Sequence, residues 1–291
     1  MESSNLANKE KVEKNKIKSI NKFNNLKSDY FLQKVFSNLE RKKSINIVKY
    51  NNNIKERLNI NINDYKECSS IEIEIKPVNN KYGQFINYGK KDEKYYHIYF
   101  NNNEEEIKRN YINKNEKIKI IKIIIDYQVK SFENLFYNCF CIESINFKKF
   151  YRNNINNMIG MFSRCSSLKK LNLNNFNTNN VTYMNNMFSG CSSLKELNLN
   201  KFNTNNVTYM NNMFSECSSL IELNVNNFNI NNVKDMSGMF SGCSSLKKLN
   251  LNNFNTNNDI NMKGMFYRCS NELIKKIKAL YKNIKIKAFL K

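Results

Sequence analysis

The sequence predicts an α/β fold: a leucine-rich repeat solenoid with 26-residue coils, each a short strand plus a short helical turn. A small α+β N-terminal region precedes the coils, and a C-terminal helix closes them. Residues 161–186 and 187–212 are near copies of one phrase, and a less similar copy follows at 213–238. A cysteine also recurs every 26 residues. A fixed period of this length indicates stacked structural units.

The N-terminal segments precede the repeats and do not share their period. Residues 1–22 are charged and aperiodic, which predicts a disordered basic arm. Residues 23–66 are expected to form a helical segment, because apolar residues recur there at helical spacing. In its first helix these residues are Phe31, Leu32, Val35, Phe36 and Leu39.

Residues 26–60 partly resemble an F-box, a short helical module. The matching residues are Leu26, Val35, Phe36, Ser37, Leu39 and Ile47. Lys27 stands where that module usually has proline, and its trailing tryptophan is absent. The resemblance implies docking to a ubiquitin-ligase adaptor. The alternative is a helical cap packed against the sheet that follows.

Residues 68–131 are expected to form a β-rich N-terminal cap region. Isoleucine alternates with glutamate over 71–75, as in a half-buried strand, and Pro77 either ends that strand or marks an edge. Further strands are expected within 82–89, 95–100 and 117–129. We expect the last of these strands to continue directly into the repeats, because the first coil of a solenoid otherwise exposes its core.

Each unit of the repeats, residues 132–269, carries two apolar patterns. SSLKKLNLNNF (166–176) follows L-x-x-L-x-L-x-x-F, which is typical of a leucine-rich repeat whose middle residues form a short strand. In NVTYMNNMF (180–188), apolar residues at i, i+3, i+6 and i+7 predict a short helical turn on the opposite side. The FNTNN segment between them is expected to turn, since asparagine tolerates a left-handed backbone.

The recurring pattern MFxxCSSLxxLNLxxFNTxNVxxM resembles the BspA-like (DUF285) class of leucine-rich repeat surface proteins. That class includes bacterial surface proteins and large families in microbial eukaryotes. The resemblance implies the leucine-rich repeat fold and raises a role as a cell-surface adhesin. Its bacterial members are secreted, whereas residues 1–25 contain no apolar stretch of a secretory signal. We therefore expect a cytoplasmic protein.

Residues 270–291 leave the repeat and are expected to form a C-terminal helical cap. Ser270 is a plausible N-cap. The apolar stripe of this helix is Leu273, Ile274, Ile277 and Leu280. Lysines lie outside the stripe, so the alternative is a basic amphipathic helix that binds a membrane surface.

Composition and motifs point away from several functional classes. The net charge of +22 permits nucleic acid or anionic membrane as a partner, but the sequence has no nucleic-acid-binding motif. No apolar run reaches the ~18 residues needed to cross a bilayer. His97 is the only histidine, and Cys139 and Cys141 lack further ligands at zinc spacing. We expect no enzyme activity, no cofactor and no metal site.

The recurring cysteines are expected to be buried thiols that act as small apolar side chains. They are Cys139, Cys165, Cys191, Cys217, Cys243 and Cys269. Identical side chains on successive coils do not provide the dihedral angle of a disulfide without adjustment.

The candidate binding residues lie beside the inward-facing leucines and form three columns on the concave strand face. The first column is Lys170, Glu196, Glu222 and Lys248. The second is Asn172, Asn198, Asn224 and Asn250, and the third is Asn174, Asn200, Asn226 and Asn252. Only the charged column varies, so it is the one able to specify a partner. The asparagines reflect either biased composition with amide ladders between coils, or an adaptable hydrogen-bonding surface.

The sequence therefore favours a non-catalytic protein-binding scaffold that uses its concave face. Two alternatives remain: an F-box-like substrate receptor of a ubiquitin ligase, and a cell-surface adhesin. A specific nucleic acid and a membrane span are not expected. The protein partner is not identified by the sequence.

We expect Leu197→Asp to unfold the neighbouring coils, because it places an unpaired charge in their shared core. Asn198→Asp, one residue away on the outward side, should leave the fold intact. Circular dichroism of both variants measures this difference. An equal loss of signal would contradict the inward and outward assignment.

Overall fold

The protein is described by a computed structural model. It describes residues 28–37, 51–60, 64, 69–150, 152–252, 254, 260–282 and 284–290. The basic arm predicted for residues 1–22 lies outside these residues. The chain divides into two compact units, Met1–Ser69 and Ser70–Lys291.

The first unit contains two short helices, α2 (Asp29–Ser37) and α4 (Asn52–Arg57). Leu32, Phe36 and Ile54 are buried together in a small apolar cluster. The apolar face of α2 is narrower than predicted, because Val35 is 39% exposed. Of the residues that resemble an F-box, Leu26, Leu39 and Ile47 lie outside the described part of the chain.

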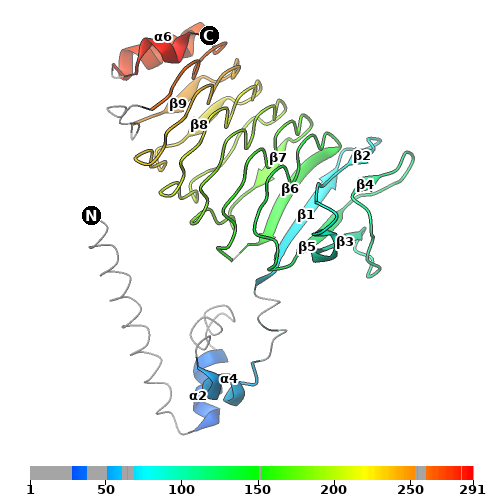
Figure 1. The fold of residues 1–291 in the computed structure, drawn as a ribbon. Coiled ribbons are helices and arrows are strands. Elements are labelled where there is room, and N and C mark those ends of the chain that lie inside the picture. Colours follow the sequence, from blue (N-terminus) through cyan, green and yellow to red (C-terminus); the bar gives the residue numbers. More distant parts are fainter. Residues whose placement is uncertain are drawn as a thin grey trace. The chain divides into compact units, whose positions relative to one another are not determined.

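The second unit begins with a five-stranded sheet in the order β3-β5-β1-β6-β7 (Figure 1). The strands are β1 (Ile71–Pro77), β3 (Tyr96–Phe100), β5 (Ile121–Ile125), β6 (Ile142–Lys149) and β7 (Lys170–Asn172). β1 is antiparallel to both neighbours, and β7 is parallel to β6. The isoleucines of β1 are fully buried and its glutamates half-buried, as the alternation predicts. Pro77 is the last residue of this strand.

The strand that pairs with the repeats is not the expected one. The chain after β5 runs directly into the repeats, where Ser131 bridges to Asn157, but β5 itself pairs with β3 and β1. β1 pairs instead with β6, the strand of the first repeat, through a register that includes Ile75 opposite Ile145. A strand with one buried face and two available edges can pair on either side. The apolar pattern therefore identifies strands without fixing their order.

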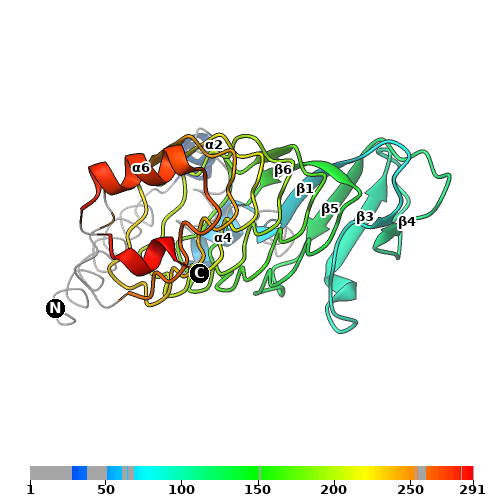
Figure 2. The same ribbon diagram turned by 90° about the horizontal axis from the view of Figure 1, so that it is seen from above.

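The remaining elements are short. β2 (Gly83–Gln84) pairs with β4 (Tyr111–Ile112), and β8 (Glu222–Asn224) pairs in parallel with β9 (Lys248–Asn250). Two short 3-10 helices, η1 (Glu93–Tyr95) and η2 (Ile286–Phe289), and the helix α6 (Asn271–Leu280) complete the unit. Figure 2 shows β3 and β4 at one end of the unit and α6 at the other.

Successive 26-residue units lie side by side between β1 and α6 (Figures 1 and 2). Parallel backbone bridges join equivalent positions along the whole stack. They connect Ser131, Asn157, Tyr183, Tyr209, Asp235 and Asn261 in order. The period read from the sequence is therefore the period of contact between neighbouring units.

The predicted helical turn is replaced by a ladder of main-chain hydrogen bonds, which we call the turn ladder. Within 185–191, N–H groups alternate between two kinds of acceptor. Every second N–H donates to the next unit at 2.7–2.9 Å, and the bonds are Asn186 to Asn211, Phe188 to Met213 and Gly190 to Ser215. The intervening N–H groups donate three residues back within their own unit, as Met187 does to Met184 at 3.2 Å. Since half of the donors face the next unit, the segment cannot be an α-helix.

Two positions in each unit have a positive φ and make this alternation possible. The first column is Asn134, Gly160, Asn186, Asn212, Gly238 and Gly264. The second is Asn138, Arg164, Gly190, Glu216, Gly242 and Arg268. Glycine and asparagine adopt this region most readily, whereas other residues pay ~1–2 kcal/mol. Most of the chain's few glycines thus have a backbone role in the repeats.

The core of the stack is a column of phenylalanine rings. Phe162, Phe188, Phe214 and Phe240 are fully buried, and neighbouring rings lie 5.5–5.7 Å apart and nearly parallel. Phe136 and Phe266 extend the column at its two ends. This stacking adds to the burial of apolar surface, which is the main favourable term in folding.

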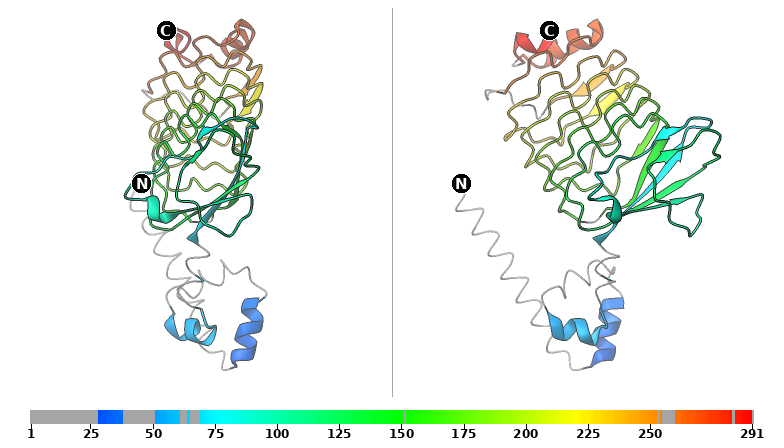
Figure 3. Two further views of the ribbon diagram at one scale, coloured as in Figure 1. Left: turned by 90° about the vertical axis from the view of Figure 1, so that its right-hand side faces the viewer. Right: turned by 45° about the vertical axis from the view of Figure 1, so that its right-hand side comes forward.

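The C-terminal end of the stack is covered by α6 and by η2 (Figure 3). Ser270 caps α6 as predicted, accepting the N–H of Leu273 at 3.2 Å. Leu273 and Ile277 are buried, but Leu280 is 71% exposed, so the predicted stripe is too long. The sequence did not predict η2, which supplies the carbonyls of Lys287 and Ala288 to the last rung of the turn ladder.

We expect Glu216→Gly to raise the free energy of unfolding by about 1 kcal/mol, because residue 216 has a φ of 57°. Urea unfolding followed by circular dichroism measures this change. Gly190→Ala is the converse control. Its φ is 73°, and its Cβ would lie 3.3 Å from the Cα of Arg164, so stability should fall. A Glu216→Gly variant no more stable than the parent chain would contradict the role given to this column.

Candidate binding face

The three predicted columns lie along one side of the stack, which we call the strand face. Their twelve residues are exposed, except Asn226 and Asn250, which are half-buried. Leu197, Leu223 and Leu249, which alternate with them, are buried. The structure thus places the predicted binding residues along one face, with ten of the twelve exposed.

The strands of this face are less regular than predicted. β7, β8 and β9 carry three of the four rows, but residues 196–198 do not form a strand. Among the described residues, one backbone bond links this row to the next, from the N–H of Ile221 to the carbonyl of Lys195 at 3.1 Å. The sheet is therefore interrupted between β7 and β8.

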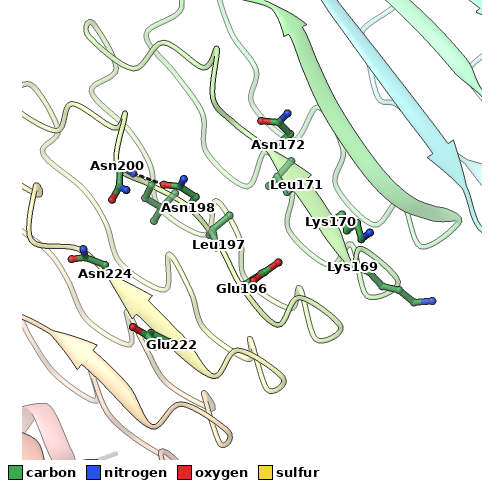
Figure 4. Close-up of a pocket in the computed structure, with 11 residues that line it drawn as sticks. Lys169, Lys170, Leu171, Asn172, Glu196, Leu197, Asn198, Asn200, Glu222 and Asn224 are labelled. Carbon is green, nitrogen blue, oxygen red and sulfur yellow. Dashed lines mark hydrogen bonds between the residues drawn. The ribbon is translucent and has the colours of Figure 1, made fainter.

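A shallow, open groove of about 600 Å³ lies at this interruption (Figure 4). Leu171, Leu197 and Leu199 form its apolar part. Its polar lining includes Lys169, Lys170, Asn172, Glu196, Asn198, Asn200, Glu222 and Asn224. Seven of the twelve predicted residues therefore border one depression.

The charged column is partly neutralised from within. Glu222 pairs with Lys248 at 3.2 Å. Lys169, beside the column, pairs with Glu143 at 3.3 Å, and Lys76 pairs with the same carboxylate at 2.9 Å. Hydrogen bonds from Lys76 and then Lys169 lower the pKa of Glu143. Within the part of the chain that the structure describes, neither Lys170 nor Glu196 belongs to an ion pair.

The second column does not form the predicted amide ladder between coils. Each Oδ1 in it accepts the N–H two residues further on, at 3.0–3.1 Å. These bonds join Asn172 to Asn174, Asn198 to Asn200, Asn224 to Asn226 and Asn250 to Asn252. They are local turns of the kind asparagine favours. The column therefore ends each row of the face.

An amide ladder does occur elsewhere, in the turn that follows each row. The Nδ2 group of Asn203 donates to Oδ1 of Asn179 at 3.0 Å, and Asn229 repeats this bond to Asn205 at 2.9 Å. Thr178 both accepts the N–H of Asn203 and donates to its carbonyl. These asparagines hold neighbouring units together.

The recurring cysteines are buried and free, as predicted. Five of their Sγ atoms donate a hydrogen bond to the carbonyl of the phenylalanine 29 residues earlier, at 3.0–3.1 Å. The five are Cys165, Cys191, Cys217, Cys243 and Cys269. A thiol here is a small apolar group and also a weak donor, so it satisfies a carbonyl of the preceding unit. Burial raises the pKa of Cys217 to about 12.

His97 lies on β3, away from the strand face in the order of strands. Its Nδ1 is 3.1 Å from Glu106, and its Nε2 is 3.4 Å from Asp126. All three side chains are partly exposed. The histidine links β3 to two carboxylates at the surface.

Arg152 is a buried charge that the sequence did not reveal. Its Nη1 donates to the carbonyl of Asp126, and its guanidinium lies over the ring of Tyr127. Burial lowers its pKa to about 10. It joins the first repeat to the segment after β5, so it supports the junction between cap and stack.

Two further findings concern the described residues alone. No group of histidine, cysteine, aspartate or glutamate side chains is arranged to hold a metal ion. No helix combines the length and the apolar character needed to cross a bilayer.

Comparison with protein families matches the stack to the model described as "Mycoplasma protein of unknown function, DUF285", over residues 130–248 and 195–280. These matches span more than half of the chain, and the chain belongs to this family. The family recognised from the repeated phrase is confirmed. No curated protein and no solved structure matches the chain.

We expect the free energy of unfolding to fall as the pH rises from about 9 to about 12. Thiols ionise near pH 9 when unfolded, whereas the folded Cys217 thiol ionises near 12. The folded state therefore binds more protons in this window, so stability is full below pH 9 and is lost above it. Urea unfolding at a series of pH values measures the fall.

Cys217→Ser is the matched control. Its hydroxyl can donate to the carbonyl of Phe188 but does not ionise in this window. The variant should show a shallower fall. An equal fall, or iodoacetamide labelling of the native column at the rate seen in urea, would contradict the assignment.

Proposed function

We propose that residues 132–269 form a leucine-rich repeat solenoid and that the protein is a non-catalytic scaffold. In this proposal it binds another protein through the strand face. The single observation that carries it is the groove at the interrupted row, which seven predicted residues border. Extended faces of this kind are the binding surfaces of stacked-repeat proteins.

The composition of the face favours a protein over a nucleic acid. The charged column contains two lysines and two glutamates, so it offers no net attraction to phosphates. Apart from Lys169, which pairs with Glu143, the rest of the groove consists of amide and aliphatic groups. Such a mixture suits a partner that presents charged, polar and apolar side chains together.

We include a cytoplasmic location in the proposal. The cysteines that the structure describes are free thiols, and reduced thiols are usual in that compartment.

We expect Asn200→Arg to abolish binding of the partner, because a long charged side chain would enter the groove. Proximity labelling in the native cell, with the ligase fused to the whole chain, measures which proteins are lost. Asn231→Arg is a matched control, since both positions are exposed and each N–H donates at 3.0 Å to the asparagine two residues earlier. Equal labelling by both variants would contradict a role for the strand face.

A further inference from the structure

The charges that the groove leaves unneutralised indicate the chemistry of its partner. Glu222 and Lys169 each have an ion-pair partner within the chain. Lys170 and Glu196, which occupy consecutive rows of the charged column, have none among the described residues. Both are exposed and both line the groove. A partner can therefore supply a charge to each without breaking an existing pair.

The polar groups beside these charges suit a main chain. In each lining asparagine of the second column, Oδ1 is held by the N–H two residues on, at 3.0 Å. That bond fixes the amide, and its Nδ2 group has no partner among the described residues. These donors belong to Asn172, Asn198 and Asn224. These donors follow one another along the second column and can donate to carbonyl oxygens.

We propose that the groove binds an extended peptide that runs along the stack and carries an acidic and a basic residue two positions apart. The inference rests on the proposed function and specifies the partner of the same face. The acidic side chain pairs with Lys170 and the basic one with Glu196. Leu171, whose side chain is partly exposed, contacts an apolar side chain of the peptide, and the asparagine amides donate to its carbonyls.

The spacing follows from the geometry of extended chains. Neighbouring strands are ~4.8 Å apart, and side chains two residues apart in an extended peptide lie ~6.6 Å apart on one side. Here the ring centroids of Phe176 and Phe202, which belong to the same two units, are 5.7 Å apart. Lysine and glutamate are long enough to close the remaining difference. Charges one position apart would point to opposite sides of the peptide.

The experiment is selection of a phage-displayed library of random peptides against the whole chain. We expect enrichment of peptides with an acidic residue, any residue, and a basic residue. Lys170→Glu should change the selected pattern to two basic residues at the same spacing, and Glu196→Lys should change it to two acidic residues. Each change should weaken binding of the original peptides at least tenfold, measured by fluorescence polarisation.

Lys234→Glu is the control for net charge, because Lys234 is exposed and does not line the groove. It should leave the selected pattern unchanged, and circular dichroism should show all three variants folded. Enrichment without this spacing, no enrichment, or the same pattern in every variant would overturn the inference. In each of those cases the Asn200→Arg labelling experiment still decides the proposed function.

Discussion

Main-chain hydrogen bonds between units are the interaction on which the rest of the structure depends. Half of the N–H groups of each turn segment donate to carbonyls of the unit that follows. A single unit cannot satisfy these donors, and an unpaired buried N–H costs about as much as a lost hydrogen bond. Stacking is therefore a requirement of the backbone conformation and a means of burying phenylalanine and leucine.

The same requirement explains the side chains that repeat without facing a ligand. The residues of the two positive-φ columns, which are mostly glycine and asparagine, let the N–H groups alternate in direction. The cysteine thiols donate to carbonyls of the preceding unit. Many of the asparagines, whose abundance could be attributed to biased composition, thus make a defined hydrogen bond. Conservation of the phrase from copy to copy reflects contact between neighbours, while the groove depends on the few positions that differ.

Much of this arrangement could be predicted from the sequence because its signals are local or periodic. The alternation of β1, the capping serine of α6 and the buried cysteines all follow from the pattern of side chains. The helical turn was predicted wrongly because a three-residue spacing is shared by a helix and by the turn ladder. Which strand borders the repeats was also predicted wrongly, since pairing between distant strands leaves no local signal.

The interrupted row at 196–198 could not be predicted from its own residues. Leu194–Asn200 differs from Leu168–Asn174 at one position only, with Glu196 in place of Lys170, yet only the latter segment forms a strand. β7 pairs with the eight-residue strand β6, whereas the rows beside 196–198 are the three-residue strands β7 and β8. The groove is therefore produced by the surroundings of the row, and the sequence predicts its residues without predicting the depression.

The carbonyls that η2 supplies to the last rung give the stack a direction. Every internal unit receives bonds from the unit before it and donates to the unit after it, so the internal units have equivalent junctions. The two ends are different: β1 closes one and η2 closes the other. An in-frame duplication or loss of one internal unit would recreate the same junctions and leave both ends as they are. Unequal recombination between the near-identical copies could thus lengthen or shorten the protein in whole steps, and move its binding face along with it.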